Sequence, residues 1–397
     1  LLSLSIFINL GLLVYFKYAN FFIENLNTLL YSFGWDIISW SHIALPIGIS
    51  FYTFQTITYS VDVYRKKVTP LIKPSDYMLY IMSFPQMIAG PIVRFSSIAN
   101  QIISREELYD DKLIGFYRFC IGLSKKVLIA NVMAQQADLI FNSDLESLNI
   151  AEAWIGMLAY TFQIYFDFSG YSDMAIGLGK MLGFKFPENF NNPYVSKSVS
   201  DFWRRWHMTL GEFMKDYLYI PLGGNRVNNR LRLYLNLWIV FILSGFWHGA
   251  EWNFIFWGIY HGLFLIFDRL FLLKLLEKLG GTIATIITFL IVMFGWVFFR
   301  IENIESINLY FFKLFSFNSN FQVEAKIEFW LILFIATIFS FFVKLKIGLK
   351  IQNYFFNKES YNLNEHCLMA IISMILFILS ISAITSSNFN PFIYFRF

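Results

Sequence analysis

Long stretches without charged side chains recur along this chain, and one of them contains a histidine. No Lys, Arg, Asp or Glu lies between Arg232 and Glu251, an interval about as long as a helix that spans a lipid bilayer. His248 lies within this run, in the sequence GFWHGA of residues 245–250. A titratable side chain in such a run is costly to bury in lipid and normally faces a protein-lined cavity. The run therefore predicts a membrane helix and marks His248 as a candidate functional residue.

The composition places the whole chain in the same class. Of its 397 residues, 57% are hydrophobic and only 15% are charged. A soluble fold cannot hide this much apolar surface, whereas lipid can solvate it. The net charge of +4 fits basic loops retained in the cytosol and does not indicate nucleic acid as a partner. Cys120 and Cys367 stand far apart in apolar surroundings, which favours two buried thiols over a disulfide or a metal site.

Apolar runs long enough to cross or enter a bilayer predict an all-α, multi-pass membrane protein. We expect them near residues 1–16, 42–61, 77–93, 113–141, 151–166, 170–183, 233–250, 252–273, 281–299, 328–343 and 367–386. Helix-breaking Pro and Gly residues interrupt the second run at 46–48 and the third at 84–85 and 89–91. Such breaks are tolerated at membrane depth where protein or a cavity covers the freed backbone groups. We therefore expect kinked or re-entrant helices around an internal chamber.

The domain organisation is expected to be simple. Residues 1–397 show no repeat, linker or low-complexity segment and are interpreted as a single membrane domain. Because the sequence opens at Leu1 inside an apolar run, we expect the natural protein to carry further N-terminal helices.

The stretch from Lys180 to Arg232 is polar and mostly basic, so the positive-inside rule predicts that it faces the cytosol. Ser198, followed three residues later by Asp201, has the spacing of a helix start. We expect an aromatic, amphipathic helix after it, carrying Trp203 and lying in the plane of the membrane surface.

Three parts of the chain carry a family resemblance. They are YFDFSGYSD at 165–173, FWRRWH at 202–207 with PLGGNR at 221–226, and GFWHGA at 245–250; FPQMIAGP at 84–91 also matches. In this order and spacing they resemble the membrane-bound O-acyltransferase (MBOAT) family, in its bacterial polysaccharide branch. That branch includes the membrane subunit of alginate O-acetylation and the peptidoglycan O-acetyltransferase. The resemblance extends from about residue 40 to the C-terminus.

The resemblance implies a fold and an activity. The fold is an irregular ring of transmembrane and re-entrant helices around a central tunnel. The activity is transfer of an acetyl group from a cytosolic thioester, acetyl-coenzyme A or another acyl thioester, to an extracytoplasmic glycan such as peptidoglycan or an alginate-like polysaccharide. No bound cofactor is implied. The location would be the bacterial cytoplasmic (inner) membrane, and a periplasmic SGNH-type acetyltransferase would be a partner.

Several histidines and arginines are candidates for the site. The family's signature histidine falls on His248, which would act as general base on the acceptor hydroxyl. His261 lies thirteen residues later, too far along one straight helix to join it without a bend, and this spacing disfavours a metal site shared by the two. Arg204, Arg205 and His207 are candidates for holding donor phosphates, with anchoring at the membrane interface as the alternative.

Two acids and a tyrosine complete the candidates. Asp167 and Asp173 stand in an apolar region, so we expect a paired polar network that shapes the tunnel. Tyr394, in the aromatic tail at 390–397, is a candidate to carry the acyl group between His248 and the downstream acceptor. The alternative for this tail is a belt of aromatic residues at the membrane interface.

Two other functions stay open at this point. The same chemistry would serve D-alanyl transfer from a carrier-protein thioester to a cell-wall polymer. A transporter that flips an acylated intermediate without chemistry would also use broken helices and polar groups at membrane depth.

Overall fold

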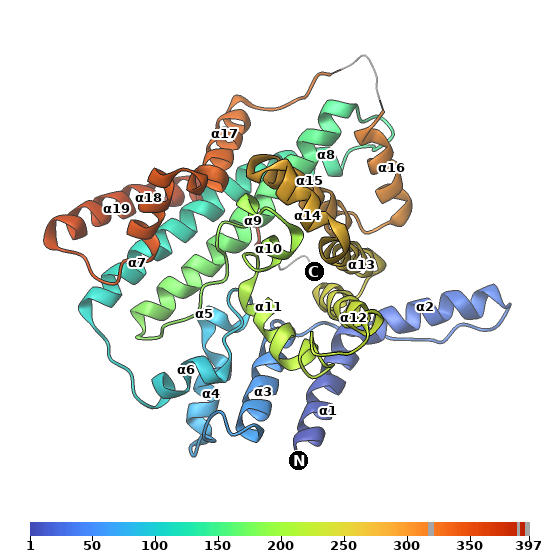
Figure 1. Cartoon of the computed structure of the whole chain (residues 1–397), viewed down its shortest axis with the longest axis horizontal. Helices are drawn as coiled ribbons and strands as arrows, with labels where there is room; N and C mark the ends of the chain where they lie inside the picture. The colour runs from blue at the N-terminus through green and yellow to red at the C-terminus, as the bar shows by residue number, and fades with distance from the viewer. Residues whose placement is uncertain (317–320, 387–389, 394–397) are drawn as a thin grey trace.

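The computed structural model describes residues 1–316, 321–386 and 390–393, and these residues form helices and loops without a β-strand (Figure 1). Within them, five helical segments are long and apolar enough to cross a membrane: Leu2–Ser32, Arg230–His248, Gly281–Arg300, Ile327–Lys344 and Leu363–Ser386. The all-α, multi-pass class predicted from the apolar runs is confirmed.

The N-terminal part contains one long helix followed by short, broken ones. Its elements are α1 (Leu2–Leu13), the π-helical segment η1 (Val14–Tyr18), α2 (Ala19–Ser32), α3 (Ile49–Tyr64), α4 (Pro74–Met82), α5 (Phe84–Met87) and α6 (Phe95–Ile103). The second apolar run becomes helical only at Ile49, because Gly48 takes a positive φ of 78° just before it. Ser83 is extended between α4 and α5, so the predicted break near Pro85 is present.

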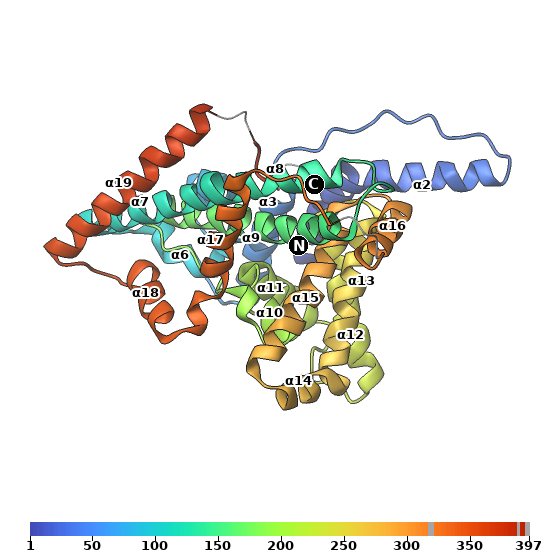
Figure 2. The same ribbon diagram turned by 90° about the horizontal axis from the view of Figure 1, so that it is seen from above.

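The central layer consists of two long helical stretches that pack side by side (Figure 2). One runs through α7 (Tyr109–Ser124), the π-helical segment η2 (Lys125–Ala130) and α8 (Asn131–Phe141), and the other is α9 (Ile150–Met181). We predicted two apolar runs at 151–166 and 170–183, and this split was wrong. Gly170 lies inside one continuous helix of 32 residues.

Glycines make the contact between α7 and α9 possible. A Cβ on Gly122 would lie 2.5 Å from the Gly170 carbonyl oxygen, and a Cβ on Gly115 would lie 2.6 Å from the Gly177 carbonyl oxygen. Both distances are shorter than real Cβ contacts. These glycines therefore allow two backbones to approach closely, as small residues do in membrane helix pairs.

A second group of helices runs across this layer (Figure 2). The elements of this region are η3 (Pro193–Val195), α10 (Val199–Trp203), α11 (Met208–Met214), η4 (Lys215–Tyr219), α12 (Arg230–His248), α13 (Trp252–Phe267), η5 (Asp268–Leu272), α14 (Leu273–Leu279) and α15 (Gly281–Arg300). Helices α12 and α13 pack closely, since a Cβ on Gly245 would lie 2.2 Å from the Phe254 carbonyl oxygen.

The expected amphipathic helix at the membrane surface is not present as predicted. Helix α10 starts at Ser198, whose side chain accepts a hydrogen bond from the Asp201 N–H, but it ends at Trp203. His207 then takes a φ of 44°, and α11 starts after it. The Asn189 carbonyl accepts from the Met208 N–H at 2.9 Å. The contact with Asn189, which is distant in sequence, thus turns the chain inward at His207 and interrupts the helix that the local periodicity predicted.

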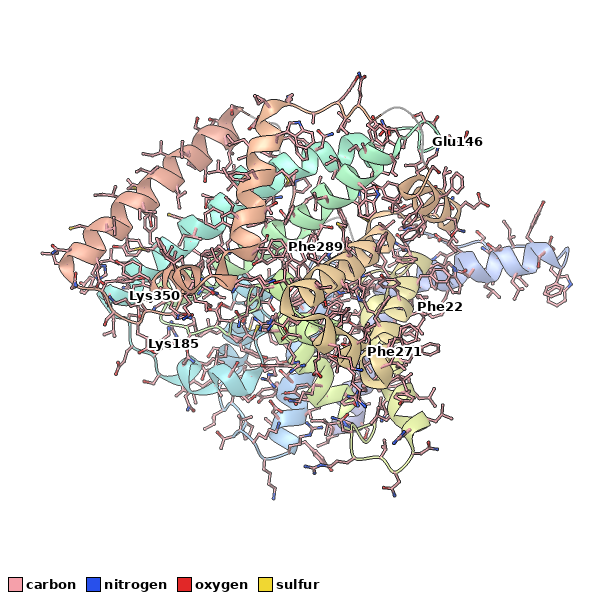
Figure 3. All side chains as sticks on the ribbon, turned by 45° about the horizontal axis from the view of Figure 1, so that its top comes forward. Phe22, Glu146, Lys185, Phe271, Phe289 and Lys350 are labelled. Atoms are coloured by element: carbon pink, nitrogen blue, oxygen red, sulfur yellow. The ribbon has the colours of Figure 1, made fainter. Side chains whose placement is uncertain are left out.

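The C-terminal part lies mostly at the periphery. Its elements are α16 (Ile304–Leu314), α17 (Ile327–Phe341), η6 (Phe342–Lys344), α18 (Lys346–Phe356) and α19 (Leu363–Ser386). Cys367 on α19 is exposed, which corrects the prediction that it is buried, whereas Cys120 is buried as predicted. Large apolar side chains such as Phe22 and Phe271 are about half exposed around the molecule (Figure 3), as expected for a surface that faces lipid.

Candidate active site

His248 is the last residue of α12 and lies where the chain turns back into α13. Gly249 is extended, and a Cβ there would lie 2.0 Å from the Phe254 ring. The imidazole is enclosed by three aromatic rings, with ring centroids at 5.0 Å for Trp247, 5.3 Å for Trp257 and 5.1 Å for Phe299. His248 is therefore held at a helix end within aromatic packing, with only 8% of its surface exposed.

Two neighbouring pockets meet near this histidine. The inner pocket is narrow, about 10 Å³, which leaves space for roughly one water molecule. It is lined by Ile164, Phe168, Trp206, His248, Trp257, Trp296, Phe299 and Ile393. The outer pocket, about 90 Å³, is more polar and is lined by Tyr160, Glu251, Asn253, Phe254, Phe299, Arg300, Glu302 and Ile393. Because both share Phe299 and Ile393, the pockets lie on either side of these two side chains.

The structure places His207 beside the inner pocket, in contact with Phe168. Its ring lies 4.7 Å from the ring of Phe168, which lines the inner pocket, and 6.2 Å from that of Trp247. Its Nδ1 lies 3.0 Å from Asn189 Oδ1; because that oxygen accepts, the imidazole donates through Nδ1. His207 is 2% exposed, so it does not lie on a surface that could hold donor phosphates.

His261 reaches the site through the turn after His248. Helix α13 packs back along α12, and the Trp257 ring contacts both imidazoles, with the His261 centroid at 5.0 Å. Its ring also lies 5.0 Å from that of Trp203. The sequence required a bend between the two histidines, near Gly249 or Gly258, and the chain turns at Gly249. His261 is separated from His248 by an aromatic ring, which places it in a supporting layer.

The two arginines of the FWRRWH motif form hydrogen bonds with residues of α10. Arg204 is exposed, and its Nε donates to the Ser200 carbonyl at 3.1 Å. Arg205 Nε donates to Asp201 Oδ1 at 3.0 Å. Of the three residues expected to bind the donor, only Arg204 therefore offers an exposed side chain.

Asp173 lies in a buried ion network between α7, η2 and α9. Arg118 donates to Asp173 Oδ1 through Nε at 2.9 Å and through a terminal nitrogen at 2.7 Å. Lys125 Nζ donates to Asp173 Oδ2 at 2.6 Å. Arg118 also binds Glu188 with two hydrogen bonds. Removing one partner from such a network would leave a buried charge uncompensated, which is strongly destabilising.

Asp167 holds the C-terminal tail. Its carboxylate pairs with Lys126, and its Oδ2 accepts from the Ile393 N–H at 2.6 Å. Lys126 Nζ donates to the Pro391 carbonyl at 3.1 Å. The chain just before Tyr394 therefore lies between the two pockets near His248. Tyr394 itself lies outside the described residues.

Residues 63–307 match the membrane-bound O-acyltransferase family. The chain belongs to this family. A probable alginate O-acetylase, AlgI, of Pseudomonas aeruginosa is 45% identical over 318 residues, which cover 80% of this chain and 61% of the relative. A peptidoglycan O-acetyltransferase of Helicobacter pylori is 42% identical over 335 residues, 77% of this chain and 62% of the relative. A teichoic acid D-alanyltransferase of Bacillus subtilis is 31% identical over 273 residues, 64% of this chain and 68% of the relative.

This member of the MBOAT family spans about three fifths of the length of the first two relatives. The resemblance seen in the sequence motifs is thereby confirmed for the family.

Sequence reasoning missed three cations: Lys17, whose Nζ donates to the His248 carbonyl at 3.0 Å, and Arg118 and Lys126, which bind Asp173 and Asp167. Each stands in or beside a run that is otherwise apolar. A charged residue in such a run usually has a partner or a task, so their positions alone could have marked them. Their partners are distant in sequence and were not predictable.

Proposed function

We propose that this protein is a membrane O-acyltransferase in which His248 acts as general base. An acceptor hydroxyl gives its proton to His248 and attacks the thioester carbonyl, so that a C–O bond forms and the C–S bond breaks. The protonated imidazole then returns the proton to the departing thiolate. The observation that carries this proposal is the position of His248, at a helix end in the lining of a narrow aromatic pocket that adjoins a more polar outer pocket.

The donor and acceptor are proposed from chemistry and from the relatives. The donor is acetyl-coenzyme A or another acyl thioester in the cytosol, and exposed Arg204 is suited to pair with its phosphates. The acceptor is an extracytoplasmic glycan, as the names of the P. aeruginosa and H. pylori relatives suggest. We accordingly propose the bacterial inner membrane as its location and a periplasmic SGNH-type acetyltransferase as its partner.

Tyr394 is proposed as an acyl relay. The tail immediately before it is held by Asp167 and Lys126 beside the pockets. The Tyr394 hydroxyl would lose its proton to His248, accept the acyl group as an ester, and pass it to the downstream hydroxyl. Tyr394→Phe keeps the ring and removes only the hydroxyl, so transfer should be abolished, and the parent protein should show an acetyl mass shift on its C-terminal peptide. Normal transfer by Tyr394→Phe would favour the aromatic belt.

D-alanyl transfer is the second candidate, favoured by the similarity to the B. subtilis D-alanyltransferase. Inverted membrane vesicles containing the protein separate the candidates. Labelled acetyl-coenzyme A or a labelled D-alanyl carrier protein is added outside, and alkali-labile ester is measured inside. We expect label from acetyl-coenzyme A, and none in vesicles carrying His248→Ala. Label from the carrier protein alone would establish D-alanylation, and transfer by His248→Ala at the parent rate would favour a transporter.

A further inference from the structure

Lys17 binds the end of the helix that carries His248. It lies in η1 and is the single charged residue among residues 1–23. Its Nζ donates to the carbonyls of Trp247 and His248, the latter at 3.0 Å. It also lies 3.4 Å from Ser50 Oγ. A residue 231 positions earlier in the chain thus contacts the backbone of His248 directly.

The contact between Lys17 and the end of α12 is favourable for both groups. The last carbonyls of a helix have no partner within the helix and form its negative end, and α12 ends at His248. A lysine in a membrane helix is costly unless its charge is matched. Among the described residues, no carboxylate forms an ion pair with Lys17. The charge of Lys17 is therefore matched by the carbonyl end of α12.

Aromatic packing fixes η1 against the same helix end. The Tyr18 ring stacks on that of Phe246, with centroids 4.2 Å apart, and Lys17 Nζ lies 5.8 Å from the Trp247 ring. Leu13, Tyr18 and Ile49 form a small buried cluster against which Phe246 packs. Lys17 is thus held in place at the turn between α12 and α13.

We propose that Lys17 is a positioning residue for His248. By binding the carbonyls of residues 247 and 248, it fixes the final peptide of α12 and with it the direction in which the imidazole leaves the backbone. The inference rests on the proposed role of His248 as base. Small displacements of a reacting group are costly, since a shift of about 1 Å can reduce rates by about a hundredfold.

The test compares Lys17→Met with Lys17→Arg. Methionine fills similar space without donating a hydrogen bond, whereas a guanidinium can still donate to both carbonyls. Ser5→Ala is the matched control, because the Ser5 hydroxyl joins α1 to Ser60 of α3 at 2.9 Å, away from His248. For each variant, kcat and KM for acetyl-coenzyme A are measured in vesicles and normalised to folded protein. His248→Ala is measured in parallel.

We expect Lys17→Met to lower kcat by about 10-fold to 100-fold with little change in KM, Lys17→Arg to recover most of this loss, and Ser5→Ala to resemble the parent. An unchanged kcat in Lys17→Met would overturn the proposal, as would an equal loss of kcat in Ser5→Ala. If His248→Ala is active, the proposed base fails instead. An inactive His248→Ala beside a normal Lys17→Met refutes the positioning role alone.

Discussion

The surroundings of His248 and those of Asp173 bury a polar side chain in opposite ways. His248 is enclosed by the rings of Trp247, Trp257 and Phe299 and adjoins a pocket. Asp173 has both carboxylate oxygens bound by cations, two of the hydrogen bonds coming from Arg118. The aromatic rings leave a pocket through which a reactant can reach the His248 imidazole. The cations around Asp173 instead use both of its carboxylate oxygens as hydrogen-bond acceptors. We therefore propose a chemical role for the first region and a structural role for the second.

The largest effect is expected at the aromatic pocket. His248→Ala should lower acyl transfer by about 10² to 10⁴-fold, the usual range for loss of a general base. Membrane insertion and thermal unfolding should stay close to those of the parent, because the change lowers the cost of burial. Transfer rate and unfolding temperature are measured on the same preparation. A His248→Ala protein with turnover close to that of the parent would contradict the catalytic role of His248.

The ion network should respond in the reverse manner. Arg118→Met leaves the buried Asp173 carboxylate with fewer partners and should lower the free energy of unfolding by about 3–5 kcal/mol. Turnover per folded molecule should be much less affected. The matched control is Lys112→Met, because the pair of Lys112 with Glu107 is about half exposed and should contribute about 0–1 kcal/mol. Equal losses in the two variants would show that burial of the network adds nothing.

The close contact between α12 and α13 gives a smaller effect. A Cβ on Gly258 would lie 2.4 Å from the Phe241 carbonyl oxygen, so Gly258→Ala should cost about 1–3 kcal/mol of stability. It should also lower transfer, since α13 carries Trp257 against His248. Gly11→Ala on α1 meets no atom within 4 Å and should be neutral or slightly stabilising. Thermal unfolding of the two variants tests the difference, and similar curves would contradict it.

The smallest effect on stability and transfer is expected for the cysteine substitutions that test the orientation of the protein in the membrane. Single cysteines are introduced by Asn228→Cys or Glu146→Cys after Cys120 and Cys367 are replaced. Asn228 precedes α12, whereas Glu146 lies between α8 and α9, where its carbonyl accepts a hydrogen bond from Lys313 of α16. An impermeant thiol reagent should label position 146 in intact cells, but position 228 only after the inner membrane is breached. The reverse labelling pattern would contradict the prediction that Lys180–Arg232 faces the cytosol, where the thioester donor is found.

Much of the class and the centre of the site could be predicted from sequence. The uncharged run before Glu251 predicted α12 and marked His248, because charge depletion and helix length are local properties. The helix break near Pro85 was also predicted correctly, because proline interrupts a helix through its own ring and its missing N–H.

The errors came from contacts distant in sequence. The apolar runs at 151–166 and 170–183 were predicted as separate, but they form one continuous helix in which Gly170 packs against Gly122. His207 was placed on a surface helix, but Asn189 draws it into the interior. Neither partner can be inferred from local pattern, because each depends on which helices become neighbours.

The π-helical segment η2 has an evolutionary consequence. A π turn holds one residue more than an α turn, so deleting a single residue within Lys125–Ala130 would restore the regular α-helix and leave the following residues facing nearly the same way. Gln136 would then keep facing the Glu324 carbonyl that it now binds. A deletion within the regular helix α9 would instead rotate all following residues by about 100°. Among descendants of a common ancestor, a change of one residue in length should therefore be tolerated better in η2 than in α9.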